Sequence, residues 1–171
     1  MSHGSCSFVG RVCYGYSADF VSSSKPGAKC FTCRRLSRPL IKEHLLQSGL
    51  FSGVCLLSPQ GESIYTYGSL QHLFKDDAQQ FLRAFRTISK KAEEETIQKG
   101  FHLSLDLSLK NKVFKIYHKT YTSIYSVSTD NQMGLLVSKL PYAVMVCVYS
   151  SPVTSAKAVK QLEYFCDKMH S

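Results

Sequence analysis

The stretch AVMVCVY, residues 143–149, limits the possible folds more than any other part of the chain. Both of its alternating sets of side chains are apolar, namely Val144, Val146 and Val148 on one side and Ala143, Met145 and Cys147 on the other. A strand with one side in water alternates polar and apolar residues, and this strand does not. We therefore predict that residues 143–149 form a central strand of a sheet that is covered on both faces.

An amphipathic helix is predicted shortly after this strand, starting at about Ser155. Its apolar residues recur at helical spacing and are Val159, Leu162, Phe165, Cys166 and Met169. Because such a stripe has to be covered, we expect the helix to lie back across one face of the sheet.

The preceding residues predict further helices and strands. Residues 39–49 favour a short helix, one face of which carries Ile41, His44, Leu45 and Ser48. Residues 53–68 favour a hairpin around a Pro-Gln-Gly turn. A middle helix, KDDAQQFLRAFRTIS, is predicted from residue 75, with Ala78, Phe81, Leu82 and Phe85 on one face. The polar run KKAEEETIQKG that follows is predicted to extend this helix or to form a loop. Strand candidates follow in FHLSLDLSL, KVFKIYHK, TSIYSVST and GLLVSKL.

These elements together predict an α+β domain over residues 39–171. The most economical arrangement is a meandering antiparallel sheet between two layers of helix. The first and last helices would cover one face, and the middle helix would cover the other.

Residues 1–38 differ in kind from the rest of the chain. They hold six basic residues and one acidic residue, a net charge of +5 within a total of +9. The segment is rich in Ser, Gly and Cys and shows neither helical nor strand periodicity, so we predict an extension with little fixed structure. A mitochondrial targeting peptide has a similar composition, and this alternative stays open although no amphipathic helix bearing arginine is visible.

Deleting residues 1–38 should therefore leave folding intact. The segment lacks the patterned apolar residues that would offset the entropy of ordering it. We expect the circular dichroism spectrum and the unfolding midpoint of the remaining chain to stay unchanged within error. A large fall in the midpoint would show that the extension packs on the core.

Several classes of protein find no support in the sequence. No apolar run approaches the roughly 20 residues of a membrane-spanning helix. Seven cysteines is an odd number, and Cys55 and Cys147 lie in apolar runs. Both observations favour a reducing, intracellular setting over a disulfide scaffold. Cys30 and Cys33 could be half of a zinc site or a redox pair, but chance spacing is favoured because no second pair or preceding strand accompanies them. No phosphate loop or catalytic motif appears, and we predict no cofactor, no metal and no enzyme activity.

Three segments carry a resemblance to a known family. They are LIKEHLLQSGLFSGVCLLSPQGESIY, KGFHLS and GLLVSKLPYAVMVCVYSSPVTSAKAVKQLEYF. The first segment resembles the opening helix and strand of the profilins. The second resembles the sequence that follows their middle helix, and the third resembles their closing strands and last helix. Residues 122–149 are closest to the divergent testis-type profilins of animals (the profilin 4 group). The resemblance implies a monomeric, cytoplasmic, cytoskeleton-associated protein that binds actin monomers, proline-rich peptides and phosphoinositides.

The resemblance implies a proline-rich-peptide site between aromatic residues of the first and last helices. Two of the aromatic positions of the family fall on Ser37 and Leu40, so half of the site is missing. The remaining candidates are Tyr65, Tyr164 and His170. Tyr164 and His170 are also interpretable as solvent-exposed residues of a terminal helix. We therefore expect a degraded site.

The actin-binding residues that the resemblance implies are Tyr125, Lys139, Lys157 and Lys160. The family carries a basic cluster on the strand that corresponds to TSIYSVST, and residues 125–128 here are Tyr-Ser-Val-Ser. Loss of such charges slows association and weakens attraction between partners. We therefore expect actin binding to be weak or absent relative to an ordinary profilin.

Phosphoinositide binding is implied for Lys110, Lys112, Lys115 and Lys119. Regular alternation along a strand predicts that Lys115 and Lys119 lie on the same side. Lysines clustered near an anionic membrane gain about 1 kcal/mol each, so vesicle binding is predicted to exceed actin binding. The alternative is a strand edge that lysines protect against aggregation.

A scaffold subunit of the roadblock or longin type is the alternative to a profilin, because those proteins share a similar order of helices and strands and act by dimerisation. The strand GLLVSKL favours a profilin, since it adds one strand before the last. Nucleic-acid binding is not expected, because 11 acidic residues offset the 15 basic residues of positions 39–171.

Overall fold

The computed structural model describes residues 38–86, 89–105 and 111–170. The predicted extension therefore lies outside the described residues except for Arg38, which is already helical. Lys110, Ser37 and the pair Cys30 and Cys33 also lie outside them. None of the described helices combines the length and the apolar character of a membrane span.

Seven strands form one antiparallel sheet in the order β2-β1-β7-β6-β5-β4-β3. Their bounds are β1 Gly53–Leu57, β2 Ser63–Gly68, β3 Phe101–Ser104, β4 Asn111–Lys119, β5 Ser123–Ser128, β6 Met133–Lys139 and β7 Val144–Ser150. The helices are η1 Lys42–Leu46, a π-helical turn that follows helical residues 38–41, then α2 Lys75–Ala84, α3 Lys90–Lys99 and α4 Ser155–His170.

The prediction of a central, doubly covered strand is confirmed by β7. It pairs with β1 on one side and β6 on the other, and its residues from Val144 to Tyr149 are all buried. Val144, Val146 and Val148 belong to one core, whereas Met145 and Cys147 belong to a second core on the opposite face. The apolar character of both sides of this strand is thus explained by two separate cores.

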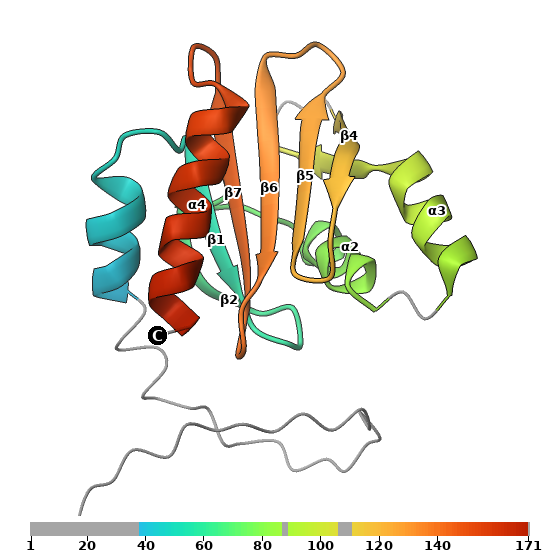
Figure 1. Ribbon diagram of the computed structural model, residues 1–171, viewed down its shortest axis with the longest axis horizontal. Helices are drawn as coiled ribbons and strands as arrows, with labels where there is room; N and C mark the ends of the chain where they lie inside the picture. Colours follow the sequence, from blue (N-terminus) through green and yellow to red (C-terminus); the bar gives the residue numbers. More distant parts are fainter. Residues whose placement is uncertain (1–37, 87–88, 106–110, 171) are drawn as a thin grey trace, which may run out of the picture.

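The predicted layers are also confirmed. Helices η1 and α4 cover one face of the sheet, and α2 lies behind the other (Figure 1). On the first face, Ile41, just before η1, and Leu45 of η1 join Leu162 and Phe165 of α4 in one apolar core. On the second face, Phe81 of α2 anchors the other core.

The polar run after α2 differs from the prediction, because it is neither a loop nor an extension of that helix. Ser89 begins a separate helix, α3, by accepting a hydrogen bond from the backbone N–H of Ala92. No residue of α3 is buried. Lys119 at the end of β4 holds it to the sheet through an ion pair with Glu93, at an Nζ–Oε1 distance of 3.0 Å.

The strand that separates a profilin from the alternative scaffold folds is present as β6, between β5 and β7. One strand departs from regular alternation. The register of β4 against β5 shifts between Ile116 and His118, so Tyr117 is an extra residue, a β-bulge.

Candidate partner-binding surfaces

The half of the sheet beyond α4 is the first candidate surface. Helix α4 runs over β7 and β6, and no helix among the described residues covers the same side of β5 and β4 (Figure 1). Aromatic side chains cover this side of β4 and β5 instead. We call this surface the tyrosine face, and it consists of Tyr117 and His118 of β4, Tyr125 of β5 and Tyr149 of β7.

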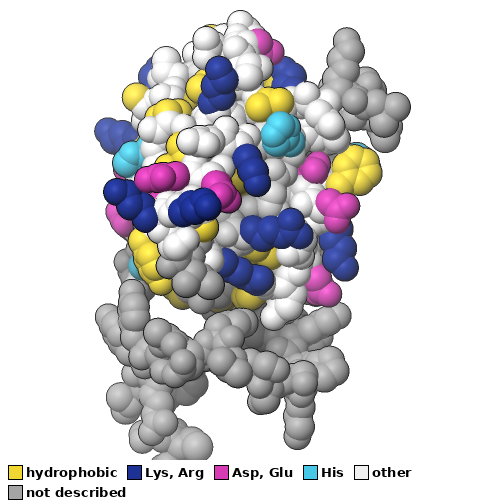
Figure 2. Space-filling model, turned by 90° about the vertical axis from the view of Figure 1, so that its right-hand side faces the viewer, with side chains coloured by type: hydrophobic (Ala, Val, Ile, Leu, Met, Phe, Trp, Pro, Cys, Tyr) yellow, Lys and Arg dark blue, Asp and Glu magenta, His cyan; other side chains and the backbone are white. Residues whose placement is uncertain are grey.

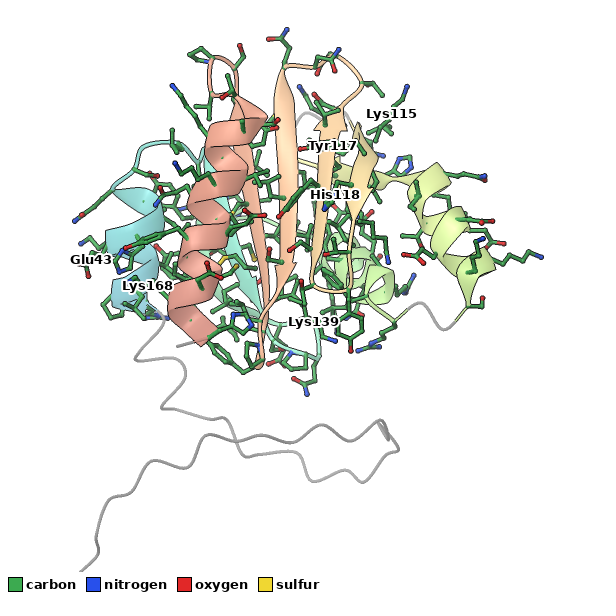
Figure 3. All side chains as sticks on the ribbon, viewed as in Figure 1. Glu43, Lys115, Tyr117, His118, Lys139 and Lys168 are labelled. Carbon is green, nitrogen blue, oxygen red and sulfur yellow. The ribbon has the colours of Figure 1, made fainter. Side chains whose placement is uncertain are left out.

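The members of the tyrosine face touch one another. The His118 ring stacks on the Tyr125 ring with a centroid distance of 5.0 Å and an interplanar angle of 18°. The Tyr117 ring is tilted against Tyr125 at 6.4 Å. Tyr125 and Tyr149 are almost completely buried, whereas the side chain of Tyr117 is 52% exposed. The surface therefore has a floor of buried tyrosine rings with the exposed Tyr117 and His118 above it. Figure 3 labels Tyr117 and His118.

Gly134 of β6 makes room for this floor. It lies opposite Tyr149, and a Cβ atom at position 134 would stand only 2.0 Å from Cζ of the Tyr149 ring. The ring thus lies across a residue that has no side chain, and the Tyr149 hydroxyl interacts electrostatically with Tyr117. Burial raises the pKa of Tyr149, so its hydroxyl stays protonated and can donate a hydrogen bond.

A hydrogen bond joins the tyrosine face to α4. The Tyr125 hydroxyl donates to Oε1 of Glu163 at 2.8 Å. Burial, reinforced by this bond, raises the pKa of Tyr125 to about 12. The bond fixes both the tyrosine and the carboxylate, which places the Glu163 carboxylate beside the tyrosine face.

The four predicted actin-binding residues do not form a cluster, and Tyr125 is the one that belongs to the tyrosine face. Lys157 and Lys160 are exposed on the first half of α4. Lys139 lies at the far end of β6, with its Nζ 4.9 Å from the centre of the Tyr121 ring. Tyr125 lies beneath its neighbours.

The serines of β5 cannot replace the missing basic charges. Ser126 and Ser128 are buried and alternate with Tyr125 along the strand, so they face the α2 side of the sheet. The Ser126 hydroxyl donates to the carbonyl of Leu135 at 2.9 Å. Of residues 125–128, only Tyr125 and Val127 therefore face the α4 side.

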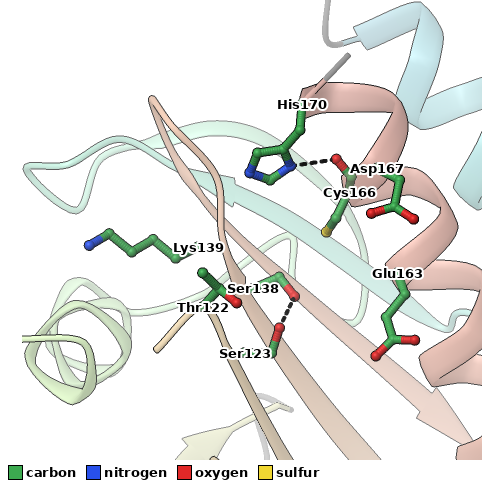
Figure 4. Close-up of a pocket in the computed structure, with 8 residues that line it drawn as sticks. All are labelled: Thr122, Ser123, Ser138, Lys139, Glu163, Cys166, Asp167 and His170. Carbon is green, nitrogen blue, oxygen red and sulfur yellow. Dashed lines mark hydrogen bonds between the residues drawn. The ribbon is translucent and has the colours of Figure 1, made fainter. Parts of the chain in front are cut away.

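An open hollow of about 430 Å³ lies beside the tyrosine face, between the ends of β5 and β6 and the second half of α4 (Figure 4). Its lining residues are Thr122, Ser123, Ser138, Lys139, Glu163, Cys166, Asp167 and His170. Burial raises the pKa of the Cys166 thiol to about 11, against the lowering effect of a hydrogen bond with Ser138. This thiol is therefore a poor nucleophile at neutral pH.

A second candidate surface lies where α4 meets η1. The His44 ring stands edge-on to Tyr164 with a centroid distance of 6.0 Å, and Nζ of Lys168 is 5.4 Å from the centre of the Tyr164 ring. Gln161 donates a short hydrogen bond to the carbonyl of His44 at 2.5 Å. Figure 3 shows Lys168 on this side of α4.

The predicted proline-peptide residues are divided by this arrangement. Tyr164 faces η1, whereas His170 lines the hollow on the opposite side of α4, where its Nδ1 lies 2.7 Å from the carbonyl oxygen of Cys166. Tyr65 is half-buried against the α4-side core. Leu40, at a position that is aromatic in the family, is half-buried against the same core.

The prediction that Lys115 and Lys119 lie on the same side of their strand is wrong. Lys115 pairs with Val127 and Lys119 with Ile124, which lie three residues apart on β5 and so face opposite sides. The bulge at Tyr117 is the cause, because one extra residue reverses the alternation that follows it.

The described lysines of β4 are also partly neutralised. Lys119 is ion-paired and its side chain is only 6% exposed, and Nζ of Lys112 lies 3.2 Å from Oδ2 of Asp130. Hydrogen bonds from the Ser128 hydroxyl and from the backbone N–H of Gln132 lower the pKa of Asp130 to about 2. Figure 2 shows lysine or arginine and acidic side chains interspersed on the side of the molecule where α3 lies.

Sequence reasoning missed Tyr117, His118 and Tyr149 on the tyrosine face, Glu163 beside it and His44 at the second surface. The segment YHKTYTSIY, residues 117–125, is unusually rich in tyrosine, and this enrichment was the available signal. The bulge and the contact between Tyr125 and Glu163, which are 38 residues apart in sequence, leave no mark in a periodic pattern.

The comparisons with known proteins agree with the fold. A family model described as profilin matches residues 38–171. No curated protein matches the sequence closely enough to serve as a relative. Profilin II of Acanthamoeba castellanii has a similar structure, with a TM-score of 0.62 and 15% sequence identity, over 76% of this chain and 93% of that one.

Two further structures are similar. LokiProfilin1, solved in a complex with rabbit actin, has a TM-score of 0.58 and 10% identity, over 80% of this chain and 95% of that one. Mouse profilin IIa, in complex with a double repeat from the FH1 domain of mDia1, has a TM-score of 0.54 and 9% identity, over 75% and 92%. At these identities the likeness shows the fold.

Proposed function

The chain belongs to the profilin family, and on this premise we propose that it is a divergent profilin that binds actin monomers with reduced affinity. The observation that carries the proposal is the open sheet face beside α4, which leaves β4 and β5 available to a large protein partner (Figure 1). LokiProfilin1, a protein of the same fold, was solved with actin. The protein would act by binding rather than by catalysis, in the cytoplasm and with the cytoskeleton.

The reduced affinity follows from the charges around the face. Two of residues 125–128 on β5 face the α4 side, Tyr125 and Val127, and neither carries a positive charge. Glu163 adds a carboxylate at the edge of the face. Lys157 and Lys160 remain as cationic residues on α4. A loss of complementary charges at the rim of an interface mainly lowers the rate constant of association.

Binding of proline-rich peptides should be weaker still. Mouse profilin IIa was solved with a double FH1 repeat, but the candidate aromatic residues of this chain are separated by α4, and Lys168 lies over the Tyr164 ring. A polyproline helix binds in grooves lined by several aromatic rings. Tyr164 with His44 offers a single pair.

Phosphoinositide binding is a second candidate function. The observation that favours it is the exposed Lys115 on β4, close in sequence to Lys110 and Lys112. The ion pair of Lys119 with Glu93 removes that lysine from the set, so vesicle binding should be modest and should fall as salt rises. We also propose, from the resemblance to testis-type profilins, that the chain belongs to that divergent branch of the family.

The test is a side-by-side measurement of binding to monomeric actin and to vesicles that contain phosphoinositide, with an ordinary profilin as the reference. We expect measurable actin binding that is at least about tenfold weaker than the reference, as for loss of one or two strong contacts. Vesicle binding should be lost at high salt. No actin binding under conditions in which the reference binds would overturn the proposal.

A further inference from the structure

We infer that Tyr117 is the main contact residue of the tyrosine face and that this face recognises its partner by aromatic contact and hydrogen bonding, with little help from charge. The inference rests on the proposed function, since the partner is taken to be an actin monomer. It goes further because it names the residue and the kind of interaction that replace the missing basic cluster.

The backbone sets Tyr117 apart from its neighbours. It is the extra residue of the bulge in β4, and β5 has no residue opposite it. A bulge often redirects a side chain away from the regular surface of a sheet. Tyr117 is accordingly 52% exposed, while Tyr125 and Tyr149 beside it are 6% and 5% exposed.

Contacts with the buried tyrosines hold Tyr117 in place before any partner arrives. Its ring centre lies 6.4 Å from that of Tyr125. It also interacts electrostatically with Tyr149, whose ring lies across Gly134. A side chain that is already ordered loses little conformational entropy on binding. Tyrosine also provides a large apolar ring together with a hydroxyl that can donate and accept, and it is enriched among residues that dominate binding energy.

The charges near Tyr117 are few and of both signs. Glu163 is engaged by the Tyr125 hydroxyl, and Lys115 is the exposed lysine of the same strand. His118 lies flat on Tyr125. Among the described residues of this face and its edge, Lys115 and Glu163 offset each other, so the face has no strong net charge to attract an oppositely charged surface, and binding should depend little on salt.

The experiment compares Tyr117→Ala with Tyr121→Ala. Tyr121 is a matched control, because it is 69% exposed and lies in the turn between β4 and β5, where it contacts Lys139 instead of the tyrosine face. Binding to fluorescent actin, kept monomeric by latrunculin, is measured for both variants and for the unmodified chain from about 50 to 300 mM salt, a range over which the screening length falls roughly twofold.

We expect Tyr117→Ala to weaken actin binding at least about tenfold and Tyr121→Ala to change it less than about twofold. Raising the salt concentration should weaken actin binding by the unmodified chain less than about threefold. Tyr117→Phe should retain the part of the affinity due to the ring. Circular dichroism and melting of each variant show whether it is folded, and the salt series on the unmodified chain needs no variant at all.

The outcomes separate the two claims. If the unmodified chain does not bind actin, the proposed function fails, and the inference fails with it. If it binds but Tyr117→Ala binds equally well, or if salt abolishes the binding, the inference is wrong while the proposed function stands.

Discussion

Replacing Leu162 by alanine is expected to lower the free energy of unfolding by about 2–5 kcal/mol. Leu162 has no exposed surface and lies in the α4-side core with Ala158 and Phe165. Alanine would leave a cavity between α4 and the central strand, and the surrounding side chains are held too tightly by their own packing to fill it. The effect is large because a domain of this size is stable by only about 5–15 kcal/mol in total.

Urea denaturation of Leu162→Ala beside Lys160→Ala tests this expectation. Lys160 lies two residues away on the same helix and is exposed, so its alanine variant controls for helix propensity and for handling. It should shift the free energy of unfolding by less than about 0.5 kcal/mol. Equal stability of the two variants would mean that α4 does not pack on the sheet as described.

The layers of the fold were predictable because their signals are periodic and strong. Two apolar sides on residues 143–149 require two covered faces, and the stripe that contains Leu162 supplies one cover. These patterns arise from the burial of apolar side chains, which drives folding more than any other interaction. The separate helix α3 was missed because a run of charged residues that buries nothing has no such pattern.

The candidate site was less predictable because single residues and long-range contacts create it. A strand with one inserted residue looks the same in sequence as a regular strand, so regular alternation places the lysines of β4 on one side although the bulge divides them. Similarly, neither Tyr125 nor Glu163 reveals that they share a hydrogen bond. The resemblance indicated this region of the sheet, and the geometry of the bulge is what led us to propose Tyr117 within it.

Gly134 is the position where fold and partner surface depend on each other most directly, and Gly134→Ala should destabilise the protein by about 1–3 kcal/mol. The backbone of Gly134 does not have a positive φ, so alanine suits its conformation. The cost arises from the Tyr149 ring, which would lie about 2.0 Å from the new Cβ and would have to leave its buried position. A displaced ring would also change the surroundings of Tyr117, which interacts electrostatically with Tyr149.

A double-mutant cycle shows whether the ring is the cause. In a Tyr149→Ala background the space above position 134 is empty, so adding the methyl group of Gly134→Ala should cost almost nothing or even stabilise the strand slightly. In a Tyr149→Phe background the ring remains, and the full cost of about 1–3 kcal/mol should return. Urea denaturation of the six proteins gives a coupling energy of similar size between positions 134 and 149. If Gly134→Ala costs the same with and without the ring, contact with Tyr149 is not what requires glycine at this position, and the floor beneath Tyr117 is not held in the way described.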